Sequence, residues 1–362
     1  MIDETERLFR EGGLLAQAPE IDEPILLAAL DARYGITGRL VRLDTEADST
    51  YRLRGERDGE PGEFLVKVSQ PEEPLDVVRC QADVIAWIEA TDPALPVQSI
   101  VPDRSGAPYG AFEDPVGSFR GLLRVHRFIP GSLLVEADPD PAQLREVGAA
   151  LGRLDTALRN FEHPGTERVL VWDLARFVSF EPLIALEPDA GRRALAQRVF
   201  DGFAERVVPR LASARTQVIH GDFSPYNVVV DPGRDPGGFV TGIIDFGDTV
   251  RTPVVFDPAV LLCNHVREAP GHPWEAAGHL LAGYHREFPL EPDEVGMLVD
   301  ATLARIALRA LVSNWRISRG SDRADYIRTH AARDWIRLEN ALAHGYAAAR
   351  DHLAAAICTP AA

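Results

Sequence analysis

Two aspartates and an asparagine lie at the ends of short apolar stretches in the middle of the chain. Asp222 ends the stretch 218–221, Asn227 lies five positions further on, and Asp245 follows a second apolar stretch at 242–244. Short apolar stretches bounded by turn residues are typical of buried strands. Two such strands paired as a hairpin deliver all three side chains to one end.

Phosphoryl transfer needs this set of groups. One carboxylate orients the attacking hydroxyl, while a second carboxylate and a neutral amide oxygen hold magnesium. Each tripeptide alone is a weak signal, because an aspartate beside a glycine is most often a turn residue. The spacing Asp222-x4-Asn227 followed by Asp245-Phe246-Gly247 matches a kinase signature, with Gly221 where protein kinases have arginine. This ordered combination indicates a kinase.

The elements that must position these residues change in type along the chain. The first part contains the following predicted elements: a helix over 24–34 that stops at Gly35, strands within 40–68 broken by a turn at 58–62, a helix over 74–90, and strands over 97–101 and 122–128. After Pro130-Gly131 the pattern is mostly helical, beginning at 141–161, apart from short strands at 217–220, 228–230 and 242–245. The pattern predicts an α+β chain with a small lobe over residues 1–128 and a larger helical lobe over 129–362.

The composition and net charge of the chain limit the kinds of molecule that it is expected to bind. The 362 residues carry a formal net charge of −17 without a compensating basic stretch, which argues against binding nucleic acid or an anionic membrane. The alternative reading of this charge is a well-solvated acidic surface. No apolar run is long enough to span a bilayer. The acidic start and three scattered cysteines favour a reducing cytoplasm. We expect a monomer or a homodimer.

The segments 220–227 and 244–248 resemble the signature of the aminoglycoside phosphotransferase and choline kinase-like superfamily. Within it, the segments 45–51, 241–248 and 283–290 resemble the hydroxylysine kinase-like branch, and the resemblance runs from about Tyr34 to Leu338. It implies a protein kinase-like two-lobed fold, with an N-terminal antiparallel-sheet lobe that binds nucleotide and a mostly helical C-terminal lobe that binds the acceptor.

The resemblance implies a small-molecule kinase. Such an enzyme transfers the γ-phosphate of ATP or GTP to a hydroxyl of a hydroxylysine-like amino acid, an amino alcohol or an aminoglycoside. One alternative is a nucleotide-binding pseudokinase or regulatory module, against which the intact Lys67, Asp222 and Asp245 argue. Another is a protein kinase, which the short segment between Asp248 and Asp257 disfavours.

The resemblance also assigns roles. Asp222 looks like the catalytic base, Asn227 and Asp245 like the Mg²⁺ ligands, and Lys67 like the lysine that binds the α- and β-phosphates. Further nucleotide-binding candidates are Ser49 and Thr50 at a hairpin tip that lacks a glycine-rich motif, and His126 and Phe128 in the linker 124–131. Gln81 lies where an acidic partner of Lys67 is expected, and its rivals are Glu72, Glu73, Asp83 and Glu89. Asp257 is predicted to be a helix N-cap that braces the catalytic loop.

The acceptor site is predicted to lie in the helical lobe. Trp172 and Asp173 suit an ammonium group through cation–π contact and ion pairing. Arg305 and Arg316 suit a carboxylate, and Trp315 resembles a position near the acceptor pocket of the family. For each of these residues the alternative is a packing aromatic or a charge on a helix surface.

Overall fold

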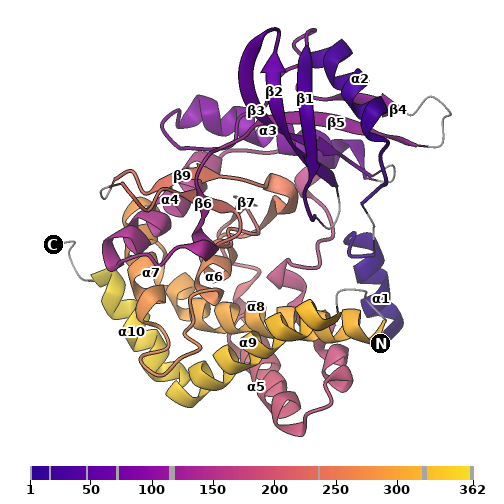
Figure 1. Ribbon diagram of the computed structural model, residues 1–362. Helices are drawn as coiled ribbons and strands as arrows, with labels where there is room; N and C mark the ends of the chain where they lie inside the picture. Colours follow the sequence, from indigo (N-terminus) through magenta and orange to yellow (C-terminus); the bar gives the residue numbers. More distant parts are fainter. Residues whose placement is uncertain are drawn as a thin grey trace.

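The chain forms two lobes joined near residue 130 (Figure 1). This computed structural model describes residues 2–15, 18–45, 48–70, 73–113, 119–234, 237–319 and 324–358. The N-terminal lobe is an antiparallel sheet with the strand order β1-β2-β3-β5-β4. Its elements are α2 (Glu23–Tyr34), β1 (Ile36–Arg42), β2 (Ser49–Arg57), β3 (Glu60–Val68), α3 (Leu75–Thr91), β4 (Gly110–Glu113) and β5 (Arg120–Arg127).

The C-terminal lobe is mostly helical. Its helices are α4 (Pro141–Leu158), η3 (Leu174–Leu186), α5 (Ala190–Arg206), α6 (Phe256–Cys263), α7 (Glu275–Glu287), α8 (Pro292–Ser318), α9 (Ala324–His344) and α10 (Tyr346–Cys358). Two small sheets lie at the junction of the lobes: β7 (Thr216–Ile219) pairs with β10 (Val250–Pro253), and β8 (Val228–Val230) lies between β6 (Ser132–Leu133) and β9 (Val240–Ile243). In the described part of the chain, no helix is long and apolar enough to cross a membrane.

The predicted two-lobed α+β architecture is confirmed, but some predicted elements differ. The predicted turn at 58–62 is too long, since only Asp58 and Gly59 separate β2 from β3. The strand predicted at 97–101 is wrong, because Val97 and Ile100 make only isolated bridges. Pro96 and Pro102 flank this stretch, and proline interrupts a strand ladder. Two elements were not predicted from the sequence: β4 and the first helix, α1 (Ile2–Glu11), which packs on η3.

Two small residues allow α4 and α7 to pack backbone against backbone. A Cβ atom at Gly148 of α4 would collide with the carbonyl oxygen of Leu280, and one at Gly283 of α7 would collide with that of Arg145. Helix axes normally lie 8–10 Å apart because side chains separate them. Glycine therefore brings α4 close enough to α7 for their backbones to touch.

This contact predicts that Gly148→Ala lowers the free energy of unfolding by about 2 kcal/mol, because the colliding atom belongs to the backbone and cannot move aside. Urea denaturation followed by circular dichroism measures the change. Gly296→Ala in α8 is the matched control, since a Cβ atom there meets nothing within 4 Å. That control is expected to raise stability slightly through helix propensity. Equal effects of the two substitutions would contradict the packing argument.

Candidate active site

The segment after β7 is fixed by a buried carboxylate. The backbone N–H groups of His220 and Gly221 donate to Asp257 at 2.8 and 3.0 Å. Asp257 is fully buried in the first turn of α6. The prediction that Asp257 is the helix N-cap is wrong, because α6 begins one residue earlier and Val255 holds the cap position. Its carboxylate is thereby free to brace the catalytic segment.

Asp155 of α4 lies behind Asp257. Burial, and then the charge of Asp257, raises the pKa of Asp155 well above its usual range. The Tyr284 hydroxyl donates to Asp155 Oδ2 at 2.6 Å. A neutral Asp155 whose O–H donates a hydrogen bond to the Asp257 carboxylate satisfies both carboxyl groups. The catalytic segment is therefore anchored to the α4 and α7 core.

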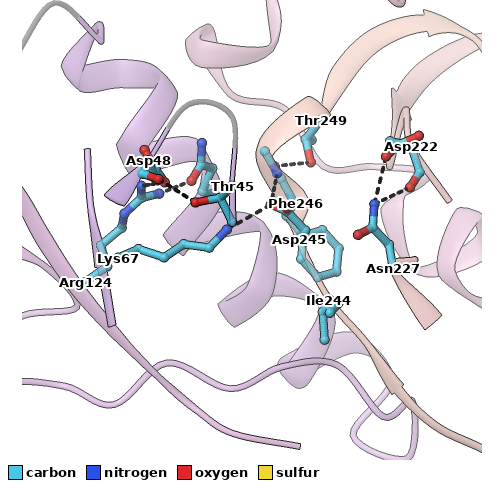
Figure 2. A network of polar contacts seen from close by, with 12 residues as sticks. Thr45, Asp48, Lys67, Arg124, Asp222, Asn227, Ile244, Asp245, Phe246 and Thr249 are labelled. Carbon is cyan, nitrogen blue, oxygen red and sulfur yellow. Dashed lines mark hydrogen bonds and ion pairs between the residues drawn. The ribbon is translucent and has the colours of Figure 1, made fainter. Parts of the chain in front are cut away.

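Asp222 is held by two donors. Asn227 Nδ2 donates to Asp222 Oδ2 and to its backbone oxygen, both at 2.8 Å (Figure 2). Arg305 Nη2 donates to Asp222 Oδ1 at 3.1 Å from a side chain that is only 4% exposed. Because its nitrogen is used twice, Asn227 keeps its amide oxygen as an acceptor. Asp222 is thus oriented before any substrate arrives.

Asp245 lies across from this group, at the end of β9. Its backbone has φ 62°, in the left-handed region that aspartate tolerates better than most residues. Lys67 Nζ donates to Asp245 Oδ1 at 2.9 Å (Figure 2). The Lys67 ammonium lowers the pKa of Asp245 to about 2, so the carboxylate is charged at neutral pH. Asp248, three residues on, has its pKa raised to about 6 by burial and then by Asp222.

The donor set fits magnesium only in part. The Asn227 oxygen and the Asp245 carboxylate are hard oxygen ligands of the kind that Mg²⁺ prefers. Among the residues that the structure describes, no three His, Cys, Asp or Glu side chains gather as a metal cluster. Kinase sites normally complete the coordination of Mg²⁺ with substrate phosphates and water. The residues present therefore fit a metal that arrives with a nucleotide.

None of the residues predicted as the partner of Lys67 forms an ion pair with it within the described residues. Gln81 of α3 accepts a hydrogen bond from Arg124 instead. Asp83 faces His163 at 3.4 Å. Glu89 is exposed, Glu72 lies outside the described residues, and Glu73 accepts from Gln81 Nε2 at 3.4 Å. Lys67 is paired with Asp245, one of the two predicted metal ligands.

The predicted nucleotide-binding residues divide between the two faces of the sheet. Thr50 pairs with Lys67, so it shares the Lys67 face. The neighbouring Ser49 points to the other face, where its hydroxyl donates to the Pro19 carbonyl. The structure therefore brings Thr50 to the Lys67 group but not the Ser49 side chain.

In the linker, His126 is 6% exposed and occupies the Lys67 face two residues after Arg124. Burial lowers the pKa of His126 to about 3, so the ring is neutral. The Phe128 N–H donates to the Glu63 carbonyl at 3.1 Å, and the Arg52 guanidinium lies over the Phe128 ring. Phe128 also lines an open cavity of about 500 Å³ that includes neither Lys67 nor Asp222.

The predicted acceptor residues are not all brought together. Trp172 lies under Arg305, whose Nη1 also donates to the Trp172 carbonyl at 2.9 Å. Asp173 accepts from the Thr252 hydroxyl at 2.7 Å and lines a small cavity beside Gly221. Trp315 is buried, with its ring 4.3 Å from that of Phe9, so it packs α8 against α1.

Arg316 occupies the last turn of α8 beside Trp315. Among the predicted acceptor residues, only Arg305 reaches the catalytic carboxylate by a direct contact.

A contact between two charged side chains of this region was not predicted, although Arg124 lies in the predicted linker and Asp48 lies next to the predicted hairpin residues Ser49 and Thr50. Arg124 of β5 is buried, and its Nη2 donates to Asp48 at 2.6 Å. A signal was present, since Arg124 and His126 occupy alternate positions next to the apolar residues Leu123 and Val125. Two polar residues on one face of a buried strand indicate a polar cleft rather than a core.

The class of protein is a kinase-like phosphotransferase. Three features define it: the two lobes, the lysine on a strand, and Asp222 facing Asp245. Residues 38–296 match the phosphotransferase enzyme family (APH), and the chain belongs to this family. Hydroxylysine kinase of Mus musculus is 24% identical over 338 residues, covering 89% of each chain. The predicted superfamily and its hydroxylysine kinase-like branch are confirmed.

Two solved structures share the fold. A microcompartment-associated aminopropanol kinase aligns with a TM-score of 0.70 at 19% identity, covering 91% of this chain and 99% of that one. An amicoumacin kinase in complex with AMP-PNP, Ca²⁺ and Ami aligns with a TM-score of 0.66 at 17% identity, covering 94% and 96%. The protein is a small-molecule phosphotransferase that acts on a hydroxyl group.

Proposed function

We propose that this enzyme transfers the γ-phosphate of ATP or GTP to a hydroxyl of a small acceptor that carries an amino group. The observation that carries the proposal is the oriented Asp222, held by Arg305 and Asn227, facing the charged pair Lys67 and Asp245. Phosphoryl transfer depends mainly on positioning and on stabilising charge, and this arrangement supplies both.

Each side chain has a defined part in this proposal. Asp222 accepts the proton of the acceptor hydroxyl as the hydroxyl oxygen attacks the γ-phosphorus and the bond from that phosphorus to the β,γ-bridging oxygen breaks, so that ADP or GDP leaves. Arg305 keeps Asp222 in place through the hydrogen bond from its Nη2 to Asp222 Oδ1. Asn227 and Asp245 would hold Mg²⁺, which neutralises charge on the phosphates when bound. Lys67, now paired with Asp245, would donate to the α- and β-phosphates.

Two observations support the proposed class of acceptor: the names of similar proteins and the position of the Asp173 side chain. The similar proteins include a hydroxylysine kinase and an aminopropanol kinase, whose names both denote amino-bearing hydroxyl compounds. Asp173 lies beside Gly221, and burial raises its pKa although the Thr252 hydroxyl and the charge of Arg176 oppose this effect. An acceptor ammonium would pair with this carboxylate. Arg305 is committed to Asp222, which weakens its predicted role in holding a substrate carboxylate.

The reaction is tested with a panel of hydroxylated amino acids, amino alcohols, aminoglycosides, sugars and neutral alcohols, each with ATP and with GTP. Release of ADP or GDP is expected only with amino-bearing compounds and only with Mg²⁺, and EDTA is expected to abolish it. Turnover confined to sugars or neutral alcohols would contradict the acceptor class. Binding of nucleotide without turnover of any compound would favour the pseudokinase alternative.

A further inference from the structure

Buried polar atoms without partners gather on the Lys67 face of the N-terminal sheet. Thr50, Lys67 and Arg124 are paired in register across β2, β3 and β5, so they form one row. Within the described residues, Thr50 Oγ1, Arg124 Nε and both ring nitrogens of His126 are buried and have no hydrogen-bond partner. Such atoms are rare in folded proteins. Their concentration beside a single lysine indicates the site of a polar ligand.

Arg124 is the most deeply buried charge of this row. Its side chain is 1% exposed, Nη1 donates to Gln81, and Nη2 donates to Asp48 at 2.6 Å. A guanidinium has five N–H donors, and burying a cation is costly unless anions compensate it. Asp48, which lies just before β2, is the anion that Arg124 contacts directly.

Figure 2 shows Arg124 next to Lys67, with Arg124 reaching Asp48 and Lys67 extending toward Asp245. The loop that carries Asp48 precedes β2 and ends next to Thr50, at the end of the sheet where Lys67 lies. In kinases the helix after the strand lysine carries a glutamate that pairs with that lysine. Here Gln81 of α3 accepts from Arg124, so α3 orients an arginine instead.

We propose that Arg124 is a second phosphate-binding cation of the nucleotide site and that Asp48 occupies its guanidinium when no nucleotide is bound. The inference rests on the proposed function and deepens it. Phosphate oxygens match a guanidinium in charge and geometry. Lys67 and Arg124 then bind the phosphate chain side by side, with Thr50 as a further donor. Because two anions repel each other at this distance, binding exchanges the Asp48 carboxylate for a phosphate.

Two substitutions with opposite expected signs test this inference. Arg124→Lys is expected to weaken binding of Mg²⁺·AMP-PNP and Mg²⁺·GMP-PNP about tenfold, roughly the value of one charge-assisted hydrogen bond. Asp48→Asn is expected to tighten binding of both about threefold or more, because a competing anion is removed. Neither substitution is expected to change the affinity for adenosine or guanosine. Isothermal titration calorimetry measures all these affinities.

The chain offers a matched control in Asp58→Asn. Asp58 is also a loop carboxylate paired with an arginine, since Arg104 Nη2 lies 2.6 Å from Asp58 Oδ1. This substitution is expected to leave nucleotide affinity unchanged. An Asp48→Asn variant that binds triphosphate more weakly would overturn the inference, because Asp48 would then be a structural support of the loop. The affinity of the Asp48→Asn variant tests the inference even if the Arg124→Lys variant does not fold. A wild-type enzyme that binds neither analogue would instead contradict the proposed function.

Discussion

Asp222→Asn is expected to lower kcat about 10³-fold with the best acceptor of the panel, because an amide cannot take the proton of the attacking hydroxyl. Affinity for Mg²⁺·AMP-PNP is expected to change little, since Asp222 contacts Arg305 and Asn227 rather than the Lys67 group. Steady-state release of ADP measures the first quantity, and calorimetry measures the second.

The same substitution carries a stability cost that follows from the contacts. Both oxygens of Asp222 accept from donors, so an amide must turn its NH₂ group toward Arg305 or Asn227. One donor then loses its acceptor, which is expected to lower Tm by a few degrees. Asp76→Asn, at an exposed carboxylate of α3, is the control for both measurements. An Asp222→Asn variant that keeps kcat within about tenfold of the wild type would show that another group is the base.

The candidate catalytic residues could be placed near the ends of strands from the sequence, because these positions are set locally. Asp222 and Asp245 each follow a short apolar strand, and Asn227 precedes the strand that pairs with the second of these. The β8–β9 hairpin places Asn227 and Asp245 at one end. The prediction that the strand ending at Asp222 belongs to the same hairpin is wrong, because β7 pairs with β10 in a separate sheet. Lys67 was also found from the local sequence, since a lysine flanked by apolar residues in a strand must reach a polar cleft.

The partners of these residues could not be predicted, because they depend on register and on contacts between distant elements. Arg305 lies 83 positions after Asp222 and meets it only through the packing of α8. Arg124 faces Lys67 because β3 pairs with β5, a register that neither strand specifies alone. Trp315 was read as an acceptor residue, whereas it packs on α1, a helix that the sequence analysis did not identify.

Glycine is needed at position 221 both for the local backbone conformation and for a close contact with a distant segment of the chain. Gly221 has φ +79°, and a Cβ atom there would collide with the carbonyl oxygen of Asp248. The backbone that carries Asp222 therefore lies directly against the turn that follows Asp245. We expect this contact to set the distance between the proposed base Asp222 and the proposed metal ligand Asp245. It also explains why this chain cannot have the arginine that protein kinases carry at this position.

Gly221→Ala is therefore expected to lower kcat about 100-fold or more, because a displacement of about 1 Å between reacting groups has an effect of this size. Gly59→Ala is the matched control, with φ +88° at a β-turn where a Cβ atom meets nothing within 4 Å. Both variants bear the strain of a positive φ, but only Gly221→Ala separates the Asp222 and Asp245 segments. Both variants are expected to keep their affinity for nucleotide, since Lys67 and Arg124 belong to the N-terminal lobe and Gly221 does not. Equal kcat values for the two variants would show that the backbone contact at Asp248 does not set the catalytic geometry.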